Sequence, residues 1–207
     1  AETGPMLDLP DTKPYLQRLF RPAARALDRR GMTPNTLSLA SLSASSLAGA
    51  LALEFPAATW PLLAILAAML ARLALNHMDG ILAREHGMTT PWGGLLNEIA
   101  TPAEDMALYL PLAARPEMPA SLLVSAVMLS VLVEVAGLSA LALGGARRAD
   151  GPMTKVARGT FFGALALSCA LGLAPAPWVA PALVLILGLL AVTAGNRLSR
   201  AVREVSP

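Results

Sequence analysis

Polar residues interrupt an apolar stretch of the chain and are spaced as on one helix. Asn76 and Asp79 are three residues apart, so both are expected on the same side of that helix. Gly80 and Ala83 follow, and their small side chains leave room for a ligand to approach the backbone. Arg84 ends the stretch with a planar fork of donors that suits phosphate. These residue types predict an anion site beside a carboxylate.

A second polar stripe follows after Gly93. Asn97, Thr101 and Asp105 recur at intervals of four residues, which stacks them on one face of a second helix. Carboxylate and amide oxygens are suitable ligands for hard cations such as Mg²⁺. Two helices with facing polar stripes and a short connection therefore predict a pocket for a metal ion and an anion.

At these positions the sequence resembles the CDP-alcohol phosphotransferase family of membrane enzymes. The family signature is D-x2-D-G-x2-A-R-x8-G-x3-D-x3-D, a long and specific pattern. Five positions match with the spacing intact: Asp79, Gly80, Ala83, Arg84 and Gly93. The first, third and fourth Asp of the signature are replaced here by Asn76, Asn97 and Thr101.

The resemblance implies a reaction in which an alcohol attacks a CDP-linked lipid donor and CMP is released, in phospholipid synthesis. It implies Mg²⁺ or Mn²⁺ as cofactor, and the expected ligands are Asp79, Asn76 and Asn97. The family assigns the base to its last Asp, a role that Thr101 cannot fill at neutral pH. Asp105 and Glu98 are the expected substitute bases.

The resemblance extends to residues that would bind the two substrates. The segment TPNTLSL is typical of the start of the family's first span, so Asn35 and Ser38 are expected to reach the nucleotide, although helix capping explains them nearly as well. Lys155 and Arg158 stand where family members carry basic residues that bind the phosphate of the acceptor. The resemblance also implies that the nucleotide lies against Gly80, Ala83, Arg84 and Gly93.

The composition indicates an integral membrane protein, because 55% of the residues are hydrophobic, 14% are charged and the mean hydropathy is +0.58. Six apolar segments are close to the roughly 20 residues that cross a bilayer. They lie near residues 35–53, 60–84, 94–113, 119–143, 157–173 and 178–196. The predicted fold is an all-α integral membrane protein with six transmembrane helices, preceded by an amphipathic juxtamembrane helix.

The predicted organisation is a tail over residues 1–10, an amphipathic interfacial helix over 11–31, the membrane domain over 32–198 and a basic tail over 199–207. Residues 1–5 precede a methionine and are expected to lie outside the fold, and the polar N-terminus does not read as a signal peptide. A single cysteine, Cys169, excludes an intrachain disulfide.

Positive charge predicts the orientation in the membrane. Lys and Arg gather in one set of connections and their flanks: Lys13, Arg18, Arg21, Arg25, Arg29, Arg30, Arg84, Arg147, Arg148, Lys155, Arg158, Arg197, Arg200 and Arg203. The opposite connections contain only Arg115. The positive-inside rule therefore predicts an inner-membrane protein with both termini in the cytoplasm.

Two charges, Arg72 and Glu134, fall deepest in the predicted spans and are expected to pair with each other. His77 and His86 flank the signature and are expected to be hydrogen-bonded, not metal-bound.

Three functions stay open. The chain is a divergent transferase, a catalytically impaired family member that binds lipid or nucleotide, or a small transporter with a polar site at mid-membrane. The expected partners are a CDP-linked lipid donor, an alcohol acceptor, membrane lipid and, for the assembly, a homodimer; no nucleic acid is expected.

Overall fold

The computed structural model describes residues 13–174 and 177–205, and within these residues it is all helical. The elements are α1 (Lys13–Asp28), α2 (Pro34–Glu54), α3 (Trp60–Glu85), α4 (Pro91–Tyr109), the 3₁₀ turn η1 (Leu110–Ala114), α5 (Ala120–Ala142), α6 (Lys155–Ala170) and α7 (Val179–Val205). The tail predicted over residues 1–10 lies outside the described residues.

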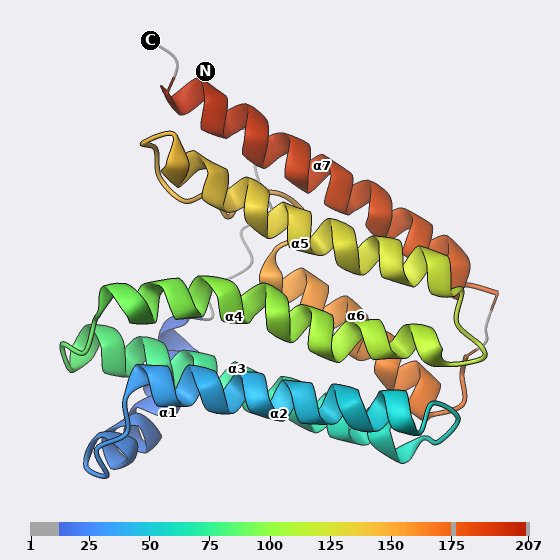
Figure 1. Ribbon diagram of the computed structural model, residues 1–207, viewed down its shortest axis with the longest axis horizontal. Helices are drawn as coiled ribbons and strands as arrows, with labels where there is room; N and C mark the ends of the chain where they lie inside the picture. Colours follow the sequence, from blue (N-terminus) through green and yellow to red (C-terminus); the bar gives the residue numbers. More distant parts are fainter. Residues whose placement is uncertain (1–12, 175–176, 206–207) are drawn as a thin grey trace.

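Helices α2 to α7 run along the long axis of the molecule as a bundle, and the short α1 lies at one end of it (Figure 1). Helix α2 packs on α3 and α4, α3 also contacts α1 and α6, and α5 packs on α7. Helix α7 continues to Val205, through most of the segment that the sequence predicted as a tail.

The apolar segments form helices where the sequence placed them, and within the described part of the chain four are long and apolar enough to cross a membrane: α2, α3, α5 and α7. The other two differ for physical reasons. Helix α4 carries Glu98, Glu104 and Asp105, and α6 has only 16 residues. The prediction of an all-helical membrane-type fold is confirmed, while the number of spans stays a prediction.

Threonine caps explain where three of the helices begin. The hydroxyls of Thr33, Thr90 and Thr154 each accept a hydrogen bond from the main-chain N–H three residues later, at the starts of α2, α4 and α6. Proline follows Thr33 and Thr90, where its fixed φ suits the first helical position. The capped ends of α2 and α4 lie at the same end of the bundle, whereas α6 begins nearer its middle (Figure 1).

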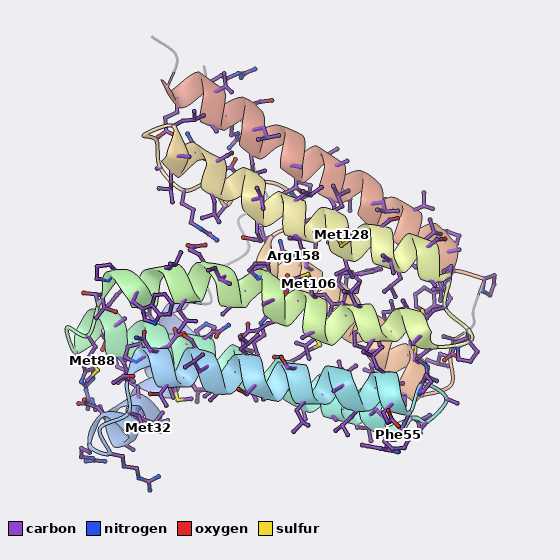
Figure 2. All side chains as sticks on the ribbon, viewed as in Figure 1. Met32, Phe55, Met88, Met106, Met128 and Arg158 are labelled. Carbon is purple, nitrogen blue, oxygen red and sulfur yellow. The ribbon has the colours of Figure 1, made fainter. Side chains whose placement is uncertain are left out.

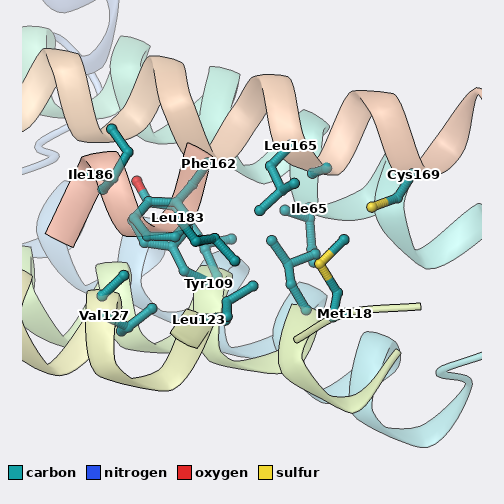
Figure 3. Packing of buried hydrophobic residues seen from close by; sticks show 14 of the residues in the cluster. Ile65, Tyr109, Met118, Leu123, Val127, Phe162, Leu165, Cys169, Leu183 and Ile186 are labelled. Carbon is teal, nitrogen blue, oxygen red and sulfur yellow. The ribbon is translucent and has the colours of Figure 1, made fainter. Parts of the chain in front are cut away.

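A continuous apolar core holds the bundle together (Figure 3). Tyr109 stacks on Phe162 with ring centroids 4.2 Å apart, which joins α4 to α6. Helices α2 and α4 approach closely at Gly49, where a Cβ atom would overlap the carbonyl oxygen of Ala107. This close approach brings the serine-rich face of α2 against α4.

Candidate functional site

The signature residues surround a cavity of about 280 Å³ at the end of the bundle where α2 and α4 begin. We call this cavity the motif pocket. It is lined by α2, α3, α4 and the connection between α3 and α4, through Pro34, Asn35, Ser38, Asp79, Gly80, Ala83, Arg84, Met88, Thr89, Thr90, Gly93, Gly94 and Asn97. Three consecutive helices thus meet around one polar space.

The two glycines of the signature have a steric role in this pocket. A Cβ atom on Gly80 would lie 2.6 Å from Nη2 of Arg84, and one on Gly93 would lie 2.7 Å from Oδ1 of Asn35. Both distances are shorter than a van der Waals contact. The glycines therefore allow the Arg84 and Asn35 side chains to lie directly against the helices that form the pocket wall.

Asp79 is the one carboxylate that lines the motif pocket in the described part of the chain. Its Oδ2 accepts a hydrogen bond from the hydroxyl of Ser38 at 3.1 Å. Ser38 belongs to a buried row on α2 with Ser41 and Ser45. The spacing of this row is a sequence signal that would have identified Ser41 as a further polar contact of the interior.

Beyond the motif pocket lies a buried group of charges that we call the central ion cluster: Arg72, Glu104, Asp105, Glu134 and Arg158. Arg72 binds Glu104 and Asp105, each at 2.7 Å. Arg158, which is 0% exposed, binds Asp105 at 3.1 Å and Glu134 at 2.7 Å. Figure 2 shows Arg158 in the interior of the bundle, close to Met106 of α4.

The predicted Arg72–Glu134 pair is wrong. Asp105 lies between the two residues and accepts hydrogen bonds from Arg72 and from Arg158. Glu134 instead binds Arg158, with Arg147 at 3.1 Å and Arg197 at 3.7 Å. A buried charge must be paired, and the α4 carboxylates satisfy Arg72 at shorter range than α5 does.

The residues predicted as bases are not open to the motif pocket. Both oxygens of Asp105 accept from arginines, and Glu98 binds Arg147 at 2.9 Å near the surface. Thr101 donates its hydroxyl to the carbonyl of Asn97 and accepts from the Nζ of Lys155, both at 3.1 Å. The two predicted bases and Thr101, at the position of the family's own base, therefore each have a protein partner.

A second cavity, of about 710 Å³, lies beside the first between α3 and α6, and we call it the apolar cavity. Asn76 and Lys155 line it, so Asn76 does not share the motif pocket with Asp79 as its spacing suggested. Arg84 lines both cavities and marks where they adjoin. Arg158 lines neither, because the central ion cluster holds it.

The histidines near the signature have hydrogen-bond partners, as predicted. Nδ1 of His77 lies 2.7 Å from the carbonyl oxygen of Leu73, and Nδ1 of His86 lies 2.8 Å from Asp28. Within residues 13–174 and 177–205, no group of three His, Cys, Asp or Glu side chains is placed to hold a metal ion. The ligand set at the signature, one carboxylate and neutral amides, does not fit a pair of divalent ions.

Comparison with known proteins identifies the class. Residues 31–194 match the CDP-alcohol phosphatidyltransferase family, and the chain belongs to that family. It is 38% identical over 161 residues to inner membrane protein YnbA of Escherichia coli (strain K12), covering 77% of this chain and 79% of YnbA. A shorter match of 82 residues, also 38% identical, links it to inner membrane protein YnjF of the same organism, of which the match spans 37%.

Solved structures confirm the fold. Phosphatidylinositol phosphate synthase of Mycobacterium tuberculosis with CDP-DAG bound matches with a TM-score of 0.62 and 22% identity, over 91% of this chain and 94% of that one. The same enzyme with manganese and citrate matches with a TM-score of 0.65 and 20% identity, over 88% of each chain. The manganese accords with the expectation of divalent metal use in the family.

Proposed function

We propose that this protein binds a CDP-linked lipid in the motif pocket and transfers its phosphatidyl-type group to an alcohol, releasing CMP, in phospholipid synthesis. The observation that carries the proposal is the meeting of the signature residues from α3 and α4 with Asn35 and Ser38 of α2 around one cavity. The nucleotide would lie against Gly80 and Gly93, and the phosphates would lie at Arg84.

The chemistry forms one bond to phosphorus and breaks another. The oxygen of the alcohol attacks the phosphorus that carries the lipid, the bond from that phosphorus to the bridging oxygen of CMP breaks, CMP leaves with the bridging oxygen and the electron pair, and the proton of the alcohol passes to water. Arg84 and Lys155 face the cavities and would stabilise the charge that develops on the leaving phosphate. Because the residues do not fit a metal pair, neither Mg²⁺ nor Mn²⁺ enters a step of this proposal.

A second candidate function is lipid or nucleotide binding without transfer. The observation that favours it is that arginines bind Glu98, Glu104 and Asp105. None of these three carboxylates is therefore free to take the proton of the attacking alcohol. A binding protein of this kind keeps the close approaches at Gly80 and Gly93 that shape the pocket and lacks only the group that accepts the proton.

Calorimetry with CDP, followed by a CMP-release assay, tests both candidates. Purified protein in lipid nanodiscs would be titrated with CDP and then incubated with CDP-diacylglycerol and a panel of alcohols. Binding with CMP release supports the transferase, whereas binding without release under any acceptor supports the binding protein. Absence of CDP binding would refute both.

A glycine variant and its control test where the nucleotide binds. In Gly93→Ala the added methyl group displaces Asn35, so CDP affinity is expected to fall. Gly188→Ala in α7 adds a methyl group with open space around it and serves as the control. Equal CDP affinity in the two variants would show that the nucleotide does not lie at Gly93.

We propose further that α2 to α7 all cross the inner membrane, that α1 lies in the headgroup layer and that both termini are cytoplasmic. Helix α1, the connections 29–33 and 86–90 and the C-terminal end of α7 lie at one end of the bundle (Figure 1). Together with Arg84 and the connection 143–154, these segments carry most of the Lys and Arg residues of the chain.

Cysteine labelling tests this orientation. In a Cys169→Ser background, Ala149→Cys and Ala114→Cys place exposed thiols at opposite ends of the bundle. An impermeant maleimide should label Ala149→Cys only from the cytoplasmic side and Ala114→Cys only from the other. The reverse pattern would invert the topology.

A further inference from the structure

Lys155 contacts one of the signature positions at which this chain has a neutral residue instead of Asp. It is the first residue of α6, and its ammonium group donates to the hydroxyl of Thr101 at 3.1 Å. Thr101 occupies the position of the last Asp of the family signature. A positive side chain therefore contacts a position where a metal-binding carboxylate would otherwise stand.

The charge balance of the site follows from this contact. Four carboxylates carry four negative charges, which two divalent ions would balance. In this chain Asn76, Asn97 and Thr101 are neutral, so Asp79 alone contributes a negative charge. Arg84 and Lys155 carry two positive charges against the single carboxylate of Asp79, so the site has a net positive charge that suits a diphosphate.

Other cations of the interior are already bound. Arg72 and Arg158 are held by the carboxylates of the central ion cluster, and Arg197 donates to the carbonyls of Val133 and Asp150. Arg84 and Lys155 line the cavities, and no carboxylate among the described residues lies within ion-pair distance of either.

We propose that Lys155 and Arg84 neutralise the diphosphate of the CDP-linked donor in place of divalent ions, so that donor binding does not require a metal. This inference rests on the proposed function. Arg84 and Lys155 both line the apolar cavity, and Arg84 also lines the motif pocket, so both cations face the space where the two cavities adjoin and where the diphosphate would lie. Ammonium and guanidinium groups bind phosphate oxygens directly, without the carboxylates that a metal needs.

Calorimetric titration of the full-length protein with CDP, in EDTA and in Mg²⁺ or Mn²⁺, tests the proposal. The affinities are expected to agree within about twofold, because charge-assisted contacts replace the ions. Lys155→Gln should lower the affinity about tenfold or more in both conditions, which corresponds to the loss of one contact to a charged group. Arg203→Gln, on the exposed end of α7, removes a charge at the same end of the bundle and should leave the affinity unchanged.

A converted site gives the complementary result. Asn97→Asp and Thr101→Asp, combined with Lys155→Gln, add two carboxylates on α4 to the site that holds Asp79 and remove the ammonium group; Asn76 is left unchanged because it lines the other cavity. This variant should bind CDP only when Mg²⁺ or Mn²⁺ is present, and Mn²⁺ binding should be visible directly by electron paramagnetic resonance. Lys155→Arg keeps the charge and should keep metal-independent binding.

The outcomes separate this inference from the proposed function. A native protein that binds CDP in Mg²⁺ but loses more than tenfold in EDTA would overturn the inference and leave the proposed function standing. Unchanged affinity in a folded Lys155→Gln variant would also overturn it. A protein that binds no CDP in any condition would refute the proposed function itself. The EDTA comparison uses the native chain and does not depend on whether a variant folds.

Discussion

The motif pocket and the central ion cluster are both polar regions inside an apolar bundle, yet they have opposite characters. The pocket contains one carboxylate, and Arg84 there has no carboxylate partner among the described residues. The cluster contains five charged residues, each of them paired and at most 6% exposed. The paired charges of the cluster therefore indicate a structural role, whereas Arg84, which lacks a carboxylate partner among the described residues, indicates a site that can accept a ligand.

Helix α4 connects the two regions and explains their difference. Asn97 lines the pocket, and one and two turns further on the helix carries Thr101 and then Asp105. Arg72 donates to the carbonyl of Thr101 at 3.3 Å and to Asp105 at 2.7 Å, so the cluster fixes the depth of α4 at the inner end of the pocket. The carboxylates of α4 that take part in the cluster, Glu104 and Asp105, thus lie about one helical turn beyond the last signature position and have a structural role.

The largest effect is expected from breaking the cluster. Arg158→Met removes the fully buried guanidinium, so Glu134 loses its nearest partner and Asp105 loses one of its two, which should lower the free energy of unfolding by about 3–5 kcal/mol. Thermal unfolding in detergent measures the change. Arg203→Met is the matched control, because that arginine is exposed. Equal stability of the two variants would contradict the structural role of the cluster.

The next effect concerns the pocket alone. Arg84→Ala should weaken CDP binding by about 1.5–3 kcal/mol, because one charge-assisted contact to phosphate is lost, and should leave thermal stability unchanged. Calorimetry measures the affinity, with the exposed Arg30→Ala as control. If Arg84→Ala lowers stability as Arg158→Met does, the two regions do not differ in the way described.

A third variant tests the contact that both regions share. Gly49→Ala inserts a methyl group against the carbonyl of Ala107, so α2 and α4 must separate, and overpacking of this kind costs about 1–3 kcal/mol. Both the unfolding temperature and CDP affinity should fall, since Ser38 and Ser41 on α2 contact the two regions. Gly188→Ala should change neither.

The smallest effect is expected at a helix cap. Thr90→Ala removes the cap of α4 beside the pocket and should cost about 1 kcal/mol. Thr59→Ala is the control, because Thr59 precedes α3 without a side-chain capping bond. Hydrogen exchange should rise in the first turn of α4 and stay slow near Asp105. Uniformly faster exchange along α4 would show that the two regions open together.

The sequence by itself determined the family and the helices. The spacing of Asp79, Gly80, Ala83 and Arg84 is a local property, since a helix repeats every 3.6 residues and Gly80 lies against Arg84 of the same helix. The lengths of the apolar segments predicted where the helices lie, because they too depend only on residues that are close together in the sequence. Thr33-Pro34 marked the start of α2 through capping, which depends only on neighbouring residues.

Only the tertiary structure decided how the charges pair. The partners of Arg72 and Glu134 depend on the depth and rotation of α4 and α6 relative to α3 and α5, and spacing within one helix carries no information about either. The separation of Asn76 from Asp79 into different cavities has the same origin, because Asn76 faces the cavity between α3 and α6 and Asp79 faces the pocket between α2, α3 and α4. Buried charges take the nearest opposite charge, and packing between helices sets which one is nearest.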